Sequence, residues 1–197
     1  MVLSHHQQRV AGLARAIAGE LGLSTDRIDG LRLAGLIHDI GKIAIPAEIL
    51  TKPAHLSEVE LQPMRTHPKI GCDLIKSREL PWPVAMTVLQ HHERLNGSAY
   101  PFGILGNEIL LEAKILGVAD VIEAMSSHRP NRPALGMAKA LEEMSQNIGV
   151  LYDQEVVEAC PKVLQQNGFG FRYEGIPAPN PAAIEEGRSI SREEQHE

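Results

Sequence analysis

The pentapeptide HDIGK at residues 38–42 constrains this chain more than any other feature. The segment before it places Ile28, Leu31 and Gly35 at spacings of three and four, which predicts an amphipathic helix. Because His38 continues this spacing, we expect its imidazole on the buried face of that helix. A buried imidazole needs a partner, so we expect a polar group or a metal beside it.

Asp39 strengthens this requirement, because an ionised carboxylate near the core is costly unless it is paired or binds a metal. Gly41 suits the left-handed residue that ends a helix, and Pro46 prevents the helix from continuing. We therefore expect His38 and Asp39 at a helix end. Alone, the pair fits two interpretations: a satisfied core histidine beside a solvated aspartate, or two metal ligands.

Length and composition limit the classes of protein to consider. The chain has 197 residues, 43% of them hydrophobic, which is enough for one domain with a full core. It has no apolar run long enough to span a bilayer and no signal pattern, so we expect a cytoplasmic protein without membrane contact. A net charge of -6 argues against binding a nucleic-acid polymer. Cys72 and Cys160 fit neither a disulfide framework nor a thiolate zinc site.

Helical periodicity places further metal-ligand side chains on buried faces. In the first predicted helix, His6 lies one turn before Val10 and shares its face. The same argument applies to four later residues, which are His67, His91, His92 and Asp120. No segment alternates convincingly as a strand would, so we predict an all-α fold of about seven helices. Residues 177–197 lack apolar periodicity and are expected to form a mobile tail.

The inward-facing groups form one candidate metal-ligand set: His6, His38, Asp39, His67, His91, His92 and Asp120. Five imidazoles and two carboxylates are too many for one tetrahedral zinc ion. They suit two octahedral metals that share Asp39 as a bridging ligand. Each residue alone also fits an ordinary core or surface position, but seven together make that interpretation improbable.

The strings HHQQRV, HDIGKI, THPKIG, HHERLNGSAYP and ADVIEA occur in an order and spacing that resemble the HD-GYP family. These proteins are cyclic di-GMP phosphodiesterases, a branch of the HD metal-dependent phosphohydrolases. The resemblance runs from about His6 to Val157, and the combined pattern is highly specific. It implies a single HD-type helical bundle, which we place at residues 1–176, with residues 177–197 as the tail.

The resemblance also implies roles for the candidate ligands. One metal would be held by His6, His38, Asp39 and Asp120, and the other by Asp39, His67, His91 and His92. Asp39 and Lys42 would be catalytic: a hydroxide bridging the metals would attack phosphorus while Lys42 contacts the scissile phosphate. Iron or manganese is favoured, and nickel, cobalt or zinc also suit these ligands. Some members with three metals carry a glutamate where this chain has Val2, so we expect two metals.

Substrate contacts are implied at Arg129, Arg132 and Glu123, which match family positions near the nucleotide, although a solvated helix end explains them too. Lys42 could instead be an ordinary surface lysine, which would be the more common case if it did not stand in this motif.

The loop at residues 96–107 is long enough to act as a lid and contains the signature residues Gly97, Tyr100 and Pro101. Four positions depart from the family pattern: Asn96, Ala99, His128 and Asn131.

We therefore expect a phosphodiesterase that hydrolyses cyclic di-GMP to pGpG, GMP or both. Two alternatives stay open: a weakly active or inactive receptor, or a phosphodiesterase for another cyclic dinucleotide. The resemblance suggests diguanylate cyclase (GGDEF) domains, or a sensory or receiver domain, as protein partners.

Overall fold

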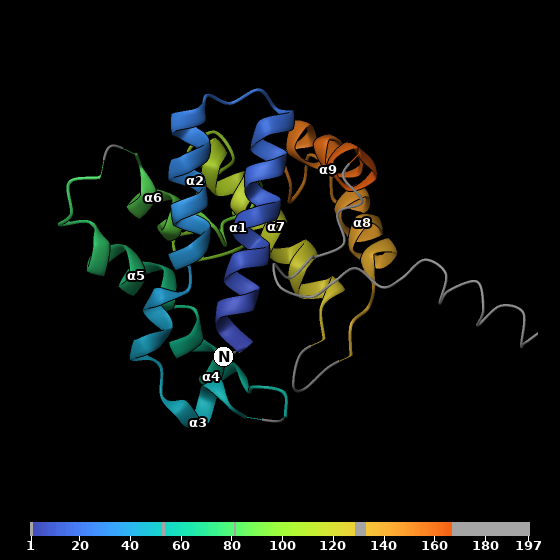
Figure 1. The fold of residues 1–197 in the computed structure, drawn as a ribbon. Helices are drawn as coiled ribbons and strands as arrows, with labels where there is room; N and C mark the ends of the chain where they lie inside the picture. Colours follow the sequence, from blue (N-terminus) through green and yellow to red (C-terminus); the bar gives the residue numbers. More distant parts are fainter. Residues whose placement is uncertain (1, 53, 81, 129–132, 167–197) are drawn as a thin grey trace, which may run out of the picture.

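The computed structural model describes residues 2–52, 54–80, 82–128 and 133–166, and within these ranges the fold is helical, with no strand (Figure 1). This confirms the predicted all-α class. The helices are α1 (Val2–Glu20), α2 (Thr25–Ile37), the 3-10 helix η1 (Ile40–Ala44), α3 (Ala47–Leu50), α4 (Glu58–Met64), α5 (His67–Ile75), α6 (Val84–Gln90), α7 (Leu111–Ser126), α8 (Met137–Gln146) and α9 (Gln154–Gln166). The predicted boundary between residues 176 and 177 lies outside the described residues.

The centre of the fold is formed by α1, α2 and α7. Figure 1 shows α1 and α2 side by side in opposite directions, with α7 crossing behind them. Their buried faces carry apolar side chains such as Leu13, Leu31 and Leu116, each at most 1% exposed. Burying one such side chain contributes about 1.5–3 kcal/mol, so this packing fixes the three helices relative to one another. No described helix is both long enough and apolar enough to cross a membrane.

The segment from Ser57 to Ile75 forms two helices. Ser57 opens α4 with a capping box, and α4 ends one residue after Pro63. A separate helix, α5, starts at His67, with Pro68 in its first turn. Proline is tolerated there because a first-turn N–H has no partner within the helix. The break places His67 at a helix start, where its side chain is buried.

Gly41 differs from the prediction, because it is not among the described glycines with positive φ and lies inside η1. What requires a glycine is close contact between η1 and α5. A Cβ atom on Gly41 would lie 2.0 Å from the carbonyl oxygen of His67 and 2.7 Å from the amide nitrogen of Gly71. This close approach brings Asp39, the residue just before η1, alongside His67.

We expect Gly41→Ala to destabilise the protein by about 2 kcal/mol or more, because backbone atoms of α5 would have to move. Gly19→Ala is the matched control: Gly19 lies in α1, and an added Cβ would meet nothing within 4 Å. That control should raise stability by up to about 1 kcal/mol. Urea denaturation measures both changes, and equal effects of the two variants would contradict the packing argument.

Candidate metal centre

The structure brings all seven predicted ligands together, although they come from distant parts of the chain. Their potential ligand atoms form overlapping groups in which all atoms lie within 4.8 Å of one another. The groups are His67, His91 and His92; His6, His38 and Asp120; and His38, Asp39 and His91. Two groups share no residue, and the third joins them through Asp39 and two histidines. The arrangement therefore fits two neighbouring metal ions better than one.

Asp39 lies between the two groups of histidines, with one carboxylate oxygen directed to each. Its Oδ1 is 3.4 Å from Nε2 of His67, whereas its Oδ2 is 3.6 Å from Nε2 of His38 and 3.9 Å from Nε2 of His6. On the second side, Oδ1 of Asp120 is 3.3 Å from Nε2 of His6. Asp39 thus has the position required of a bridging carboxylate.

Three of the histidines are oriented by helix ends. Nδ1 of His38, His67 and His91 donates to the carbonyl three residues earlier, at 2.7, 2.7 and 2.6 Å. These carbonyls belong to the last turns of α2, α4 and α6. Carbonyls in a last helical turn lack an N–H partner within their helix, so they are available to hold an imidazole. A backbone carbonyl at a fixed position therefore orients each of these three imidazoles.

The opposite nitrogen of each of these rings tests whether the site fits a metal. Nε2 of His38, His67 and His91 is buried without a hydrogen-bond partner, and the three residues are at most 2% exposed. Because Nδ1 carries the proton, Nε2 has a free lone pair, as a metal ligand must. Three such unsatisfied nitrogens around a buried carboxylate would be costly unless a cation satisfied them. The residues therefore fit a metal centre.

The electrostatics agree with this assignment. Burial, together with the neighbouring histidines, lowers the pKa of His91 to about 3, and burial also lowers the pKa values of His67 and His92. These rings are neutral at pH 7. Burial alone would raise the pKa of Asp39, but electrostatic interactions with His38 and Lys42 outweigh it and lower that pKa to about 2. The centre thus offers neutral imidazoles and an ionised carboxylate, the protonation states that bind metals.

His6 has a different environment. Burial lowers its pKa, but hydrogen bonds with Asp120 and Glu123 outweigh this effect and raise the pKa to about 9. Glu123 is 1% exposed and accepts from Nδ1 of His6 and from Arg9. Glu123 therefore lies behind the candidate ligand His6 and is buried from solvent. The sequence had instead predicted a substrate contact for Glu123. Arg9 was not predicted from the sequence, although its i+3 spacing from His6 on a helix was a usable signal.

Lys42 lies at the rim of the centre, where its Nζ donates to Oδ2 of Asp39 at 2.7 Å. Its side chain is 21% exposed, so part of it reaches solvent. The other predicted cationic contacts, Arg129 and Arg132, lie outside the described residues.

The signature loop lies against the group formed by His67, His91 and His92. The Tyr100 ring centre is 4.7 Å from that of His92, and Pro101 follows across a cis peptide bond. Gly97 has a φ of 72°, in the left-handed region that favours glycine. The loop thus places an aromatic side chain beside a metal ligand.

Glu93 anchors this loop and was missed by the sequence analysis. It is 4% exposed, and its Oε1 accepts from the backbone N–H of Phe102 at 2.8 Å. The usable signal was its position directly after His91 and His92. A second anchor is Gln90, whose Oε1 accepts from the N–H of Leu110 at 2.9 Å. These contacts fix the middle of the loop and the segment just after it, and whether the loop moves as a lid stays a prediction.

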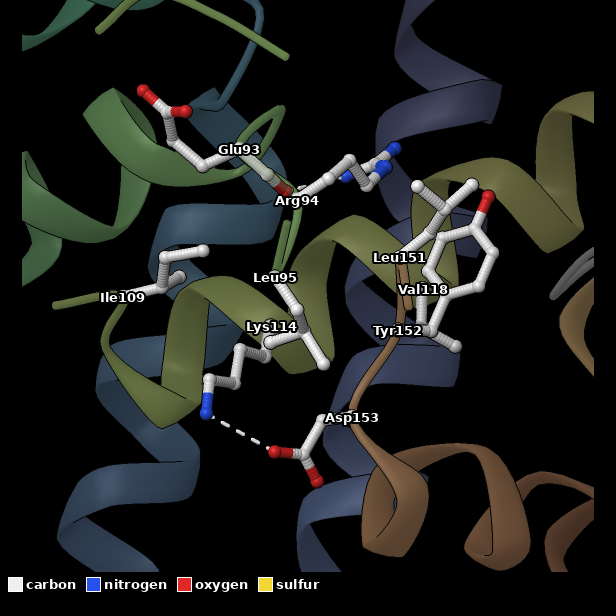
Figure 2. A pocket seen from close by; sticks show the side chains of 9 residues that line it. All are labelled: Glu93, Arg94, Leu95, Ile109, Lys114, Val118, Leu151, Tyr152 and Asp153. Atoms are coloured by element: carbon white, nitrogen blue, oxygen red, sulfur yellow. Dashed lines mark hydrogen bonds and ion pairs between the residues drawn. The ribbon is translucent and has the colours of Figure 1, made fainter. Parts of the chain in front are cut away.

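A separate small crevice is lined by side chains between Glu93 and Asp153, which Figure 2 shows. Lys114 and Asp153 form an ion pair there at 3.0 Å, while the Glu93 carboxylate points away from them. Lys114 is nine residues before Glu123 on α7, about 180° around the helix at roughly 100° per residue. None of the seven predicted ligands is among the described residues that line this crevice, so it is distinct from the metal centre.

We expect the metal-free protein to be most stable near pH 6.5 and to lose stability on both sides. Below that pH, unfolding lets His67, His91 and His92 bind protons that the fold excludes, about 1.4 kcal/mol per pH unit for each histidine at most. The raised pKa of His6 adds stability that is complete below pH 6.5 and is lost as the pH rises to about 9. Urea denaturation from pH 5 to 9 in a chelator measures this profile, and a flat profile would contradict it.

Comparison with known proteins places this geometry in a family. A family model described as HD domain matches residues 1–156. A cyclic di-GMP phosphodiesterase response regulator of Xanthomonas campestris pv. campestris is 40% identical over 154 residues, which are 77% of this chain and 41% of that relative. A 3'3'-cGAMP-specific phosphodiesterase of Vibrio cholerae is 38% identical over 160 residues, 81% of this chain and 35% of that relative. The chain spans less than half the length of these curated relatives.

A solved structure supports the fold independently. An HDG"Y"P protein from Bdellovibrio bacteriovorus superposes with a TM-score of 0.68 at 21% identity, over 83% of this chain and 52% of that chain. The match of the family model, the identities to curated relatives and the shared fold confirm the resemblance predicted from the motifs. The chain belongs to the HD domain family.

Proposed function

We propose that this chain is a metal-dependent phosphodiesterase that hydrolyses cyclic di-GMP to pGpG, GMP or both. The observation that carries the proposal is the position of Asp39 between two groups of buried histidines, with three unpartnered Nε2 atoms around it. Such a ligand set suits two divalent transition metals, and a binuclear centre is suited to displacement at a phosphate diester. The name of the Xanthomonas relative supports cyclic di-GMP as substrate.

The chain's own residues supply positioning and charge. Two bound metals would activate a water molecule and neutralise the phosphoryl oxygens. His6, His38 and Asp120 would hold one metal, His67, His91 and His92 the other, and Asp39 both. Lys42, at the rim, can turn its ammonium group from Asp39 to the scissile phosphate, where it adds a positive charge. Imidazole and carboxylate ligands suit iron, manganese, nickel, cobalt and zinc, and the resemblance to the HD-GYP family favours iron or manganese.

A second candidate substrate is a mixed cyclic dinucleotide. It is favoured by the Vibrio relative, which is named for 3'3'-cGAMP and is 38% identical to this chain. The residues expected to contact the nucleotide, Arg129 and Arg132, lie outside the described residues. The receptor alternative, the cytoplasmic location and the partner domains stay predictions.

Hydrolysis is tested with the manganese-reconstituted protein and cyclic di-GMP. We expect pGpG or GMP to appear in chromatography of the products, and Asp39→Ala to abolish their formation because the bridging carboxylate is lost. Parallel incubations with 3'3'-cGAMP and cyclic di-AMP rank the substrates. Intact cyclic dinucleotides in every incubation, with both metals bound, would support the receptor alternative.

A second prediction concerns Lys42. We expect Lys42→Met to lower kcat/KM for the cyclic dinucleotide by about 10- to 100-fold, the loss of about 1.4–2.8 kcal/mol of phosphate interaction. The metal content should stay the same, because Lys42 is not a ligand. Lys139→Met is the matched control, since Lys139 makes an exposed ion pair with Glu142 far along the chain. An unchanged kcat/KM in Lys42→Met would remove Lys42 from the catalytic residues.

A further inference from the structure

His6 is held at both ring nitrogens by residues of α7. Nε2 lies 3.3 Å from Oδ1 of Asp120, and Nδ1 donates to Oε2 of Glu123. Asp120 and Glu123 are three residues apart in α7, so both carboxylates lie on the same side of that helix. A single helix therefore supplies one metal ligand and the partner that orients a second one.

Arg9 completes this arrangement from α1. Its Nε donates to Oε1 of Glu123 at 2.7 Å, and its Nη2 donates to the same oxygen. Arg9 thus engages one carboxylate oxygen of Glu123, and His6 engages the other. Because Glu123 is only 1% exposed, its charge needs this guanidinium as a partner.

The partner that orients His6 differs in charge from the partners that orient the other histidines. His38, His67 and His91 are each oriented by a neutral carbonyl from a nearby part of the chain. The partner of His6 is an anionic carboxylate from a helix more than 100 residues away in sequence. A carboxylate acting on the outer nitrogen of a ligating histidine both fixes the ring and makes it a stronger metal donor.

We propose that Glu123, oriented by Arg9, is the positioning residue for the metal held by His6, His38 and Asp120. This replaces the substrate contact that the sequence analysis expected at Glu123. The inference rests on the metal centre of the proposed function and adds an asymmetry to it: Glu123 supports one metal and leaves the metal of His67, His91 and His92 unaffected.

Manganese binding to the purified full chain tests this proposal without any substrate. We expect Glu123→Gln to weaken one of two manganese equivalents by about 10- to 100-fold, since loss of an outer carboxylate has this typical effect, while the other equivalent keeps its affinity. Equilibrium dialysis with metal analysis gives the two affinities. The electron paramagnetic resonance spectrum should change from that of an exchange-coupled manganese pair to the six-line signal of a single manganese ion.

Glu112→Gln is the matched control. Glu112 is also a buried acid of α7, 7% exposed, and it accepts from Arg27 of α2 at 2.8 Å, away from the metal ligands. It should keep both manganese equivalents even if the protein becomes less stable. Arg9→Lys retains the charge with fewer donors, and it should weaken the same equivalent by a smaller factor. This variant tests the proposal if Glu123→Gln does not fold.

The proposal is overturned if Glu123→Gln keeps both affinities, or if both equivalents weaken together. It is also overturned if Glu112→Gln weakens manganese binding as much as Glu123→Gln, because the effect would then come from the stability of α7. Failure to hydrolyse cyclic di-GMP would contradict only the proposed function, since manganese binding is measured without it.

Discussion

The buried carboxylate of Asp39 is the group on which the rest of the centre depends. Placing an ionised carboxylate in the interior is costly unless opposite charge or metal ions satisfy both oxygens. The fold directs Oδ1 to His67 and Oδ2 to His38, and it adds Lys42 at the rim. The two metals that we propose would satisfy this carboxylate and the unpartnered imidazoles around it.

Helix ends provide the rigidity that such a centre needs. His38 directly follows α2, and His91 directly follows α6. His67 is the first residue of α5, just after the break that ends α4. In each case a carbonyl of a last helical turn orients the ring, so its free nitrogen is directed inward before any metal binds. His6 lies within α1 and lacks such an end, which explains why a side chain from another helix orients it.

Periodicity predicted the ligands because each one continues an apolar helical face, and a face that packs against the core also faces the centre. The all-α class followed from the same pattern. The periodic pattern did not predict the contacts between helices. The requirement for Gly41 arises from a carbonyl of α5, and the position of Glu123 arises from Arg9 and His6 of α1. Glu93 anchors a loop whose path no local pattern specifies. Sequence spacing identifies which face is buried, but not what meets it.

We propose that Asp39 bridges two metals, and anomalous diffraction from crystals grown with manganese would locate both of them. We predict two peaks about 3.5–4 Å apart, one on each side of the Asp39 carboxylate. One peak should lie among His6, His38 and Asp120, and the other among His67, His91 and His92. A single peak, a third peak at full occupancy, or two peaks that do not flank Asp39 would contradict the account.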